Sequence, residues 1–478
     1  MPTQLQNPGV YIQELKPFPG SIIAAETAIP AFIGYTSIAA YQGKNLINIP
    51  TKVTSLAEYE TFFGTAFTSQ FTVKADFSVK IKDNHSFHLY NSIRLFYANG
   101  GDACYIISVG TYNNKRNGLP IDEQLLIQGL NTLVNNYEPT LIVIPDAIIL
   151  GESCYSKVYI PVLAHCASMQ SCFAILDLVK PQTESDTANI ISGFRERIGQ
   201  NDLSYGAAYY PWLQTHIVTP NEVTFQNIDN LINLDKLLPE PKAKDLITRY
   251  ETLANPTDED KNQYHISLGN ASPVYLKILE SIRLQLNLLP PSGAMAGIYT
   301  TVDNTNGIWQ SPANVMLNSV DMPNINISDS TQEPINVDPK TGKSVNAIRN
   351  FSGRGTMVWG ARTLDGNSMD YLYINIRRTL IMIEQSLKTG ARILIFEPND
   401  ATTWITMKSA MTSFLNDLWK QGALMGASPN DAYDVQIGLG SSMTSADISD
   451  GVLRVRLNIA VSRPGEFITI TFEQTQAK

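Results

Sequence analysis

The sequence predicts an α/β protein, because short apolar runs typical of buried strands alternate with segments of helical periodicity. The strand-like runs cover residues 28–35, 104–109, 140–145, 172–178 and 205–210. Helical patterns cover residues 93–97, 123–133, 158–169 and 190–198. Strands that alternate with helices in this way form layered domains, so we expect a largely parallel sheet from Ser21 onward.

Polar and Pro-rich segments flank this alternation. Residues 1–20 are rich in Pro and Gly around one extended run, 10–14, which favours an arm over a core element. Residues 217–262 are more polar and end in Asp258-Glu259-Asp260. We interpret this acidic run as a solvated turn and not as a metal site.

A helical pattern returns over residues 271–288, and Pro290-Pro291-Ser292-Gly293 ends it. The stretch 300–346 is rich in Asn, Asp, Pro and Ser, so we expect exposed loops there. Such a loop-rich stretch is typical of a region near a domain boundary.

The last part of the chain, 349–478, predicts a compact α+β unit that begins with two helices. The first spans residues 370–388 and is followed by Gly390, which is well placed to end it. The second begins near Asn399 or Asp400 and is followed by Gly422. Each has one apolar face with steps of three and four, formed by Tyr373, Ile376, Leu380, Ile383 and Leu387 in the first and by Trp404, Met407, Met411, Phe414 and Leu418 in the second.

Three strands are expected in the same unit. Residues 392–396 form a short apolar run closed by Glu397-Pro398, which suits a buried strand. Apolar and polar residues alternate over 453–461, as in a strand with one buried face. Arg463-Pro464-Gly465 interrupts the alternation, which resumes in a terminal strand over 467–472.

Composition limits the classes of function. A chain of 478 residues suggests two or three domains at about 100 to 200 residues each. No apolar run approaches the roughly 20 residues of a membrane span, and the first residues lack the features of a secretory signal. We therefore expect a protein made in the cytoplasm without direct membrane insertion. The net charge of −9 argues against nucleic-acid binding, which relies on clustered Lys and Arg.

Several segments approach enzyme motifs without completing them. Thr341-Gly342-Lys343-Ser344 ends like a phosphate-binding loop, but Val337 stands where its first glycine is needed. Gly353-Arg354-Gly355 begins a dinucleotide-type pattern that lacks its third glycine, so a backbone turn is the better explanation. Residues 151–155 imitate a nucleophile elbow, but Tyr155 replaces the final glycine.

Candidate ligand and charge pairs are equally incomplete. His85 and His88 have only Asp83 nearby as a third metal ligand, so surface or satisfied histidines are expected. Arg377 and Arg378 could contact phosphate, although Glu384 and the acidic composition favour intersubunit or solvated ion pairs. Without a C-x-x-C pair, we expect the four cysteines to be reduced, packed thiols: Cys104, Cys154, Cys166 and Cys172. We therefore expect no catalytic, cofactor-binding or metal-binding residues.

Separated motifs give nearly the whole chain a resemblance to one family. The segments 351–364, 396–399 and 419–424 resemble, in this order, the C-terminal domain of contractile phage-tail sheath proteins. Residues 8–14 resemble the opening arm of the same family. Three further segments look most like the sheaths of extracellular contractile injection systems, which are phage tail-like particles. They are residues 29–36, 95–101 and 207–213.

The resemblance implies a structural subunit with the tail-sheath fold. It divides the chain into an N-terminal exchange arm (1–20), an outer α/β domain (21–345) and an inner C-terminal domain (346–478) that ends in an exchanged strand. It implies that copies polymerise helically around an inner tube and contract to drive the tube through a target envelope. An α/β nucleotide-binding enzyme is the alternative, and a soluble monomeric binding module is a third class.

The resemblance also implies partners and contact residues, but no cofactor. The partners are other copies in stacked rings, the inner tube protein, baseplate and terminal cap proteins, and related sheath paralogues. Such a particle is assembled in the cytoplasm and then released or anchored in the cell. Intersubunit strand exchange is assigned to Val10, Tyr11, Ile12, Gln13, Glu14, Phe467, Ile468, Thr469, Ile470, Thr471 and Phe472. A tether follows the arm, formed by Leu15, Lys16, Pro17, Phe18, Pro19 and Gly20. Candidate tube-facing residues are Glu384, Asp400 and Asp417.

Overall fold

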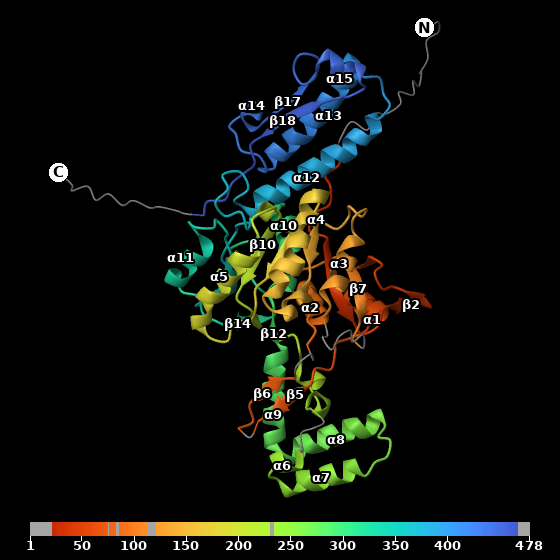
Figure 1. Ribbon diagram of the computed structural model, residues 1–478, viewed down its shortest axis with the longest axis vertical. Helices are drawn as coiled ribbons and strands as arrows, with labels where there is room; N and C mark the ends of the chain where they lie inside the picture. Colours follow the sequence, from red (N-terminus) through yellow and green to blue (C-terminus); the bar gives the residue numbers. More distant parts are fainter. Residues whose placement is uncertain (1–21, 75, 83–85, 113–120, 230–233, 467–478) are drawn as a thin grey trace, which may run out of the picture. The chain divides into compact units, whose positions relative to one another are not determined.

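A computed structural model describes residues 22–74, 76–82, 86–112, 121–229 and 234–466 (Figure 1). These residues form two compact units. The body comprises Glu26–Met382 and residues 463–466, and the small unit comprises residues 22–25 and Ile383–Ser462. The sequence-based boundaries after residues 20 and 345 concern the expected sheath domains and stay a prediction.

The main sheet of the body confirms the predicted α/β class. Its six parallel strands are, in spatial order, β7 (Cys104–Thr111), β1 (Pro30–Thr36), β8 (Leu141–Val143), β9 (Phe173–Asp177), β10 (Gly206–Tyr210) and β15 (Asn346–Phe351). Antiparallel strands complete the edges, namely β4 (Thr51–Val53) on one side, and β16 (Gly355–Val358) followed by β13 (Val315–Met316) on the other. All but β15 of the parallel strands coincide with runs predicted from the sequence. A short hairpin of β2 (Ala40–Tyr41) and β3 (Lys44–Asn45) follows β1.

Helices cover both faces of this sheet, because its strands carry apolar residues on both sides. On β1, Ile33 and Tyr35 belong to one buried cluster, whereas Phe32 belongs to the other. The first cluster is covered by α3 (Glu123–Asn131), α4 (Ile160–Met169) and α5 (Thr187–Arg197), and the second by α1 (Leu56–Phe63), α2 (Leu89–Ala98) and α10 (Ser292–Asn306). Helices α2 to α5 confirm the four predicted helical patterns, and one π-helical turn, Tyr155–Tyr159, precedes α4.

A third buried cluster organises a helical lobe of the body, labelled in Figure 1 by its helices. The lobe contains β5 (Phe71–Val73), β6 (Val79–Ile81), α6 (Leu234–Leu237), α7 (Pro241–Glu251), α8 (Asp258–Ala271) and α9 (Pro273–Leu286). The acidic run at 258–260 is the first turn of α8 and not an isolated turn, which corrects the sequence-based interpretation. Thr257 and Asp260 each accept a hydrogen bond from the other's backbone N–H. Acidic residues stabilise the positive N-terminal end of a helix.

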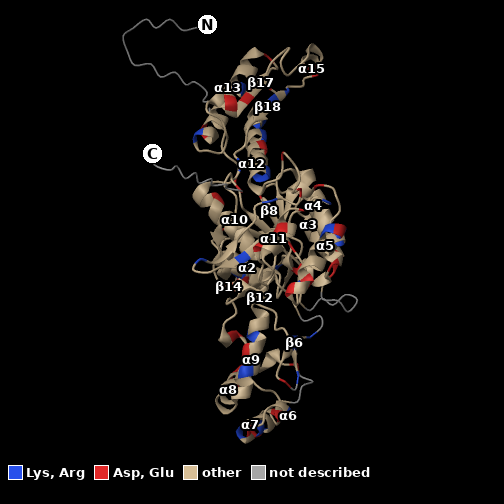
Figure 2. Ribbon diagram, turned by 90° about the vertical axis from the view of Figure 1, so that its left-hand side faces the viewer, with Lys and Arg blue, Asp and Glu red and all other residues tan. Residues whose placement is uncertain are grey.

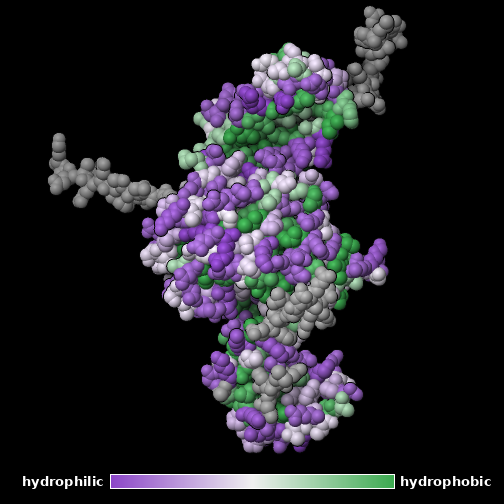
Figure 3. All heavy atoms as spheres, viewed as in Figure 1, coloured by the Kyte–Doolittle hydropathy of each residue, from purple (hydrophilic) through white to green (hydrophobic). Residues whose placement is uncertain are grey.

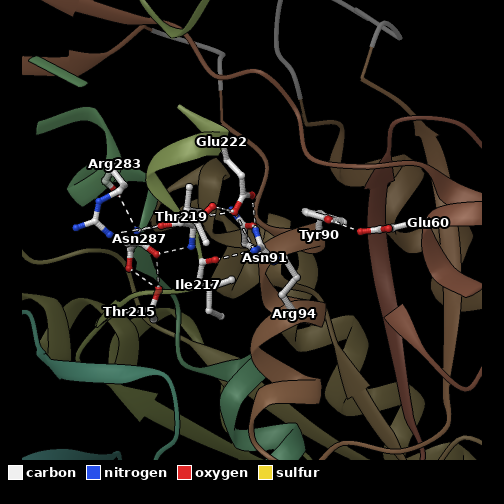
Figure 4. Close-up of polar contacts among 11 residues, drawn as sticks. Glu60, Tyr90, Asn91, Arg94, Thr215, Ile217, Thr219, Glu222, Arg283 and Asn287 are labelled. Atoms are coloured by element: carbon white, nitrogen blue, oxygen red, sulfur yellow. Dashed lines mark hydrogen bonds and ion pairs between the residues drawn. The ribbon is translucent and has the colours of Figure 1, made fainter. Parts of the chain in front are cut away.

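Polar side chains tie the lobe to the rest of the body (Figure 4). Arg94 on α2 donates to the carbonyl oxygen of Ile217 at 2.6 Å and to both carboxylate oxygens of Glu222 at 2.7 and 3.1 Å. Asn287, just after α9, accepts from Val218 N at 2.8 Å and donates to Val218 O at 2.9 Å. The chain segments that enter and leave the lobe are therefore bonded to each other and to α2.

Residues 300–346, which the sequence predicts as exposed loops, contribute to the core. Helix α10 extends to Asn306, and α11 (Asp329–Asn336) follows. Strand β14 (Val320–Pro323) joins β11 (Leu213–Thr215) and β12 (Leu288–Leu289) in a second sheet. The prediction is wrong because the average polarity hides single apolar residues that are buried, namely Leu317, Ile325, Ile327 and Ile335.

The small unit contains the predicted pair of helices. They are α12 (Ile374–Ala391), whose first residues belong to the body, and α13 (Ala401–Lys420). Two short helices, α14 (Pro429–Ala432) and α15 (Ser445–Ser449), accompany an antiparallel sheet of β17 (Tyr433–Ile437) and β18 (Val455–Ile459). Strand β18 confirms the alternation predicted over 453–461. None of the described helices has both the length and the apolar character needed to cross a bilayer.

The buried strand predicted over residues 392–396 is wrong. Residues Arg392–Leu394 form a 3-10 turn, and Ile395 and Phe396 are exposed, with Phe396 at φ +72°. Helix α12 continues to Ala391 and α13 begins one residue after its cap, Asp400, so the connection is short. Among the described residues, no strand lies beside this connection to pair with it.

Candidate assembly surfaces

Most of the predicted contact residues lie outside the described part of the chain. This applies to the arm residues 10–14, the tether 15–20 and the terminal strand 467–472. The structure does describe the junctions at which both terminal segments join the folded units, namely residues 22–25 and 463–466. The candidate surfaces in the described part of the chain are these junctions and the small unit.

Glu466 fixes the chain to the body directly before the predicted terminal strand. Its carboxylate accepts from Arg362 Nη2 at 2.8 Å and Nε at 3.1 Å, from Tyr373 OH at 2.9 Å and from Asn336 Nδ2 at 2.8 Å. The Arg362 side chain is 8% exposed and that of Glu466 17%, so water barely reaches this ion pair. Burial alone would raise the pKa of Glu466, but the hydrogen bonds from Arg362 and Asn336 outweigh it and hold the pKa below its usual value.

Asn346 on β15 holds Arg362 in place. Its Oδ1 accepts from Arg362 N at 2.8 Å, and its Nδ2 donates to Arg362 O at 2.8 Å and to Ala208 O at 3.2 Å. No local pattern in the sequence points to Glu466, because its side-chain partners lie 93 to 130 positions away along the chain. Only the fold brings them together.

The first described residues rest on the end of α12 within the small unit. Ala25 N donates to Ser386 Oγ at 2.8 Å. Ile22 packs on Gly390, where an added Cβ would come within 2.7 Å of Ile22 Cγ1. Gly390 therefore lies in the last turn of α12 and admits Ile22, rather than ending the helix as predicted. A pocket of about 180 Å³ adjoins this contact and is lined by Ile22, Ile23, Thr389, Gly390, Ala391, Ile393, Leu394, Met407, Ala410 and Met411.

The sheet of β17 and β18 has edges that can accept further strands. The antiparallel pairing runs from Tyr433 opposite Ile459 to Ile437 opposite Val455. Within the described ranges, this sheet has two strands, with single contacts beyond the end of β18 such as Met425 N to the carbonyl oxygen of Ala460. Open edges present backbone N–H and C=O groups that an added extended segment can pair.

The small unit also exposes large apolar side chains. Figure 3 shows a broad apolar area on it. Phe396 is fully exposed. Three further apolar residues are each more than half exposed, namely Ile23, Ile395 and Ile405. Exposed apolar patches commonly mark interaction surfaces.

The three tube-facing candidates are exposed but do not form one patch. Acidic and basic residues are interspersed along the small unit (Figure 2). The Asp400 carboxylate caps α13 by accepting from Thr402 N and Thr403 N, each at 3.0 Å. Asp417 lies in the last turn of α13, about 25 Å away along the helix axis at 1.5 Å per residue. Glu384 lies on the other helix, α12. Their contact with a tube stays a prediction.

Two buried aspartates occupy positions where many α/β enzymes bind an anion. Asp146 follows β8, and its carboxylate accepts from Tyr35 N at 3.0 Å and from His88 N at 2.6 Å, at the start of α2. Asp177 ends β9 and accepts from Ser292 N at 2.8 Å and Ser292 Oγ at 2.5 Å, at the start of α10. Helix N-termini at the carboxyl edge of a parallel sheet are common phosphate sites. Here the chain's own carboxylates fill them.

The protonation of these buried groups follows from their surroundings. Burial raises the pKa of Asp146 to about 6 and that of Asp177 to about 7, although the hydrogen bonds oppose this rise. Burial and the nearby Lys180 lower the pKa of His88 to about 4, so its ring is neutral near pH 7. His85, the other predicted histidine, lies outside the described residues.

The enzyme-like segments have structural roles. Lys343 is buried and its Nζ donates to Arg195 O, and Ser344 Oγ donates to Asn336 O at 2.6 Å. Gly353 and Gly355 have φ values of +75° and +79°, which confirms the predicted turn. Over the part of the chain that the structure describes, no group of three or more potential metal ligands occurs. All four cysteines are buried and free, as expected.

The expectation for Arg377 and Arg378 is wrong. Arg378 donates to both carboxylate oxygens of Asp303 on α10, at 2.9 and 2.6 Å, and both side chains are almost completely buried. Arg377 is also buried, with its guanidinium 3.8 Å from the centre of the Tyr205 ring. The error arises because α10 and the turn directly before β10 supply these partners from distant parts of the sequence.

Comparison with known proteins gives one consistent result. Residues 367–475 match the phage tail sheath C-terminal domain. The tail sheath protein of Vibrio phage KVP40 is 21% identical over 188 residues, which is 39% of this chain and 26% of that protein. The tail sheath protein of Burkholderia phage BcepMu is 26% identical over 157 residues, or 32% of each chain. These alignments thus span about a quarter to a third of the curated relatives.

Solved structures extend the similarity over the whole chain. The sheath of the extracellular contractile injection system PVC, in its contracted state, is 25% identical with a TM-score of 0.61, and the match covers 99% of both chains. The contracted helical sheath of the anti-feeding prophage AFP is 25% identical with a TM-score of 0.64, over 98% of this chain and 100% of that one. The predicted tail-sheath fold is thereby confirmed.

Proposed function

We propose that this chain, which carries a phage tail sheath C-terminal domain on the fold of injection-system sheaths, is the structural subunit of a contractile sheath. In this function, copies polymerise helically around an inner tube, and contraction of the cylinder drives the tube through a target envelope. The observation that carries the proposal is the match to two contracted sheaths over 98 to 99% of the chain.

The runner-up, an α/β nucleotide-binding enzyme, has less support. The glycine-rich candidate at 341–344 is held by Lys343 and Ser344 in contacts with the chain itself. The two helix N-termini at the sheet edge are occupied by Asp146 and Asp177. A carboxylate at each position would repel a phosphate. The similar proteins are likewise structural sheath components.

Assembly of the sheath would rest on exchanged strands. We propose that the arm residues 10–14 and the terminal residues 467–472 pair with the open edges of β17 and β18 in neighbouring subunits. Main-chain hydrogen bonds can hold such a partner without a large matched side-chain surface. The junctions support this arrangement, because Glu466 holds the chain directly before the terminal segment, and Ile22 holds it after the tether that follows the arm. Contacts of this head-to-tail kind generate helical filaments from one polypeptide.

The proposed partners follow from this role. Other copies form the stacked rings, and the inner tube, baseplate, terminal cap and related sheath paralogues complete the particle. We propose assembly in the cytoplasm of a particle that is then released or anchored in the cell. Contraction needs no nucleotide in this subunit if the extended lattice is a kinetically trapped state that relaxes when triggered.

We also propose that charge contributes to the contact with the tube. Glu384, Asp400 and Asp417 are the candidates, and a lattice repeats each weak ion pair, worth about 0 to 1 kcal/mol, many times. Reversing Asp400 would also remove the cap of α13, so the informative variant combines Glu384→Lys and Asp417→Lys with Asp400→Asn, which keeps a capping oxygen. Unchanged sheath assembly on tubes would refute this assignment.

Electron microscopy tests the overall proposal. The full chain, produced with its tube and baseplate proteins, should form long hollow cylinders around a tube, and denaturant or acid should shorten and widen them. Titrating the same preparation with nucleotide tests the alternative, a nucleotide-binding enzyme. Monodisperse monomers that bind nucleotide would overturn the sheath proposal.

A further inference from the structure

Two cysteines of the body, which the candidate assembly surfaces do not include, lie in contact. Cys166 is in the last turn of α4, which ends at Gln170 in the left-handed conformation (φ +53°). Cys172 directly precedes β9. The reversal of the chain brings the two sulfurs to 3.5 Å from each other. Both side chains are buried, Cys166 completely and Cys172 at 3% exposure.

The two thiols differ in acidity. Hydrogen bonding with Cys166 lowers the pKa of Cys172 to about 6, with a further contribution from His165, although burial opposes it. Burial and Cys172 itself raise the pKa of Cys166 well above its usual value. The thiolate is the reactive form of cysteine, so Cys172 is the nucleophile of the pair. His165, which contributes to this lowering of the Cys172 pKa, is only partly buried.

We propose that Cys166 and Cys172 are a reversible redox pair that closes to an intramolecular disulfide when the protein meets a peroxide. The Cys172 thiolate attacks one oxygen of hydrogen peroxide, the O–O bond breaks, and the departing hydroxide takes a proton to become water. Cys172 is then a sulfenic acid. The Cys166 sulfur attacks the Cys172 sulfur, the S–O bond breaks, and the thiol proton of Cys166 leaves with the hydroxyl as a second water. Two thiols and one peroxide thus give one disulfide and two waters.

The bond would join the end of α4 to the start of β9. Bond formation requires the sulfurs to approach from 3.5 Å to about 2.05 Å. The closed loop constrains the unfolded chain, so the oxidised protein should unfold at a higher temperature than the reduced protein. This inference concerns the isolated subunit and does not rest on the proposed sheath function.

Mass spectrometry tests the pair directly. The purified full chain is treated with hydrogen peroxide, quenched, unfolded and alkylated with N-ethylmaleimide. We expect two of the four cysteines to escape alkylation. The tryptic peptide that begins at Val158, which contains both residues, should carry no N-ethylmaleimide and be about 2 Da lighter than the same peptide with two free thiols. Dithiothreitol should restore all four thiols and remove the rise in unfolding temperature. Oxidation of Met169 in the same peptide does not alter the alkylation count.

Substitutions assign the bond. Cys166→Ala and Cys172→Ala should each abolish the disulfide and the rise in unfolding temperature that it causes. The matched control is Cys154→Ala, because Cys154 is equally buried but its thiol pKa is raised, and this variant should still protect two cysteines. Four alkylated thiols after peroxide treatment of the unmodified chain would overturn the proposal. So would a Cys172 sulfinic acid beside a fully alkylated Cys166.

Discussion

Glu466 and Asp177 show how the pKa of a carboxyl group inside the body is lowered at one position and raised at another. Glu466 faces the guanidinium of Arg362, so the pKa of its carboxyl is held low and the charged form is favoured. The hydrogen-bond partners of Asp177 are the neutral Ser292 hydroxyl and backbone N–H, and burial raises its pKa to about 7. The two residues should therefore affect the pH dependence of folding with opposite signs.

We expect Glu466→Gln to destabilise the body at pH 7 by about 1.5 to 3 kcal/mol, the range for hydrogen bonds to charged groups. The substitution leaves the buried Arg362 guanidinium without its counter-charge. Because the pKa of Glu466 is lowered, its contribution is present above the usual pKa of a glutamate and is lost as the pH falls through the lowered value. Urea unfolding of both proteins measures the difference. Glu251→Gln, a control at an exposed position, should have little effect on the free energy of unfolding. Equal effects of both variants would contradict the role of Glu466 in fixing the chain to the body.

Asp177 gives the opposite prediction. With its pKa raised to about 7, the folded state binds a proton more tightly than the unfolded state, so the stability it contributes is full below the usual aspartate pKa and is lost as the pH rises through about 7. We expect Asp177→Asn, which stays neutral, to flatten the decline in the free energy of unfolding between pH 5 and 8, with about 1.4 kcal/mol at stake for each unit of pKa shift. An unchanged pH profile in this variant would show that Asp177 does not titrate in this range.

At the scale of elements, what could be predicted from the sequence depends on whether the signal is local. The parallel strands are continuous apolar runs because both faces of the sheet are covered, and this signal is local in β1, β7 and β9. The helices α12 and α13 are likewise predicted from a local pattern, because each has one apolar face. The run at 392–396 has the same local signal as a strand but no strand beside it in the described chain. A strand needs a partner, which a local pattern does not supply.

The candidate surfaces were less predictable than the elements. The motifs pointed to the terminal segments, but the residues that hold them were missed. Glu466 needs Arg362, Tyr373 and Asn336, and Ile22 needs the bare backbone at Gly390. Each contact joins positions that are far apart in the sequence, so it follows from the fold and not from a motif.

Removing either of the proposed exchanged strands should block polymerisation without unfolding the body. Deleting residues 1–14 removes the arm, and Ile470→Pro removes one backbone donor from the terminal strand. Neither change alters a residue of the main sheet or of its covering helices, so we expect folded, soluble subunits by circular dichroism and sedimentation. Ile470→Val keeps the donor and should assemble as the unmodified chain does. Normal cylinders from the deletion or the proline variant would exclude strand exchange.

On the scale of the whole molecule, the two junctions lie at different distances along the sequence from the proposed exchanged strands. Glu466 adjoins Phe467, so the terminal strand would begin directly at its anchor in the body. The arm residues 10–14 are separated from the junction at Ile22 by the proposed tether, 15–20, with Ser21 following it. Movement of one subunit would therefore reach its neighbour immediately through the terminal strand. Through the arm, it would be transmitted only when the tether is taut.

The length of the tether should thus decide whether contraction passes from ring to ring. An extended residue spans at most about 3.3 to 3.6 Å, so a three-residue insertion between Lys16 and Pro17 adds roughly 10 Å of slack. The junction is held by Ala25 on Ser386 and by Ile22 on Gly390, so this slack is not absorbed there. We expect the insertion variant to assemble extended sheaths but to contract poorly when triggered with denaturant or acid. Lys16→Ala and Phe18→Ala preserve the length and should contract nearly normally. Contracted particles are counted by electron microscopy, and equal fractions for the insertion variant and the unmodified protein would rule out coupling through the tether.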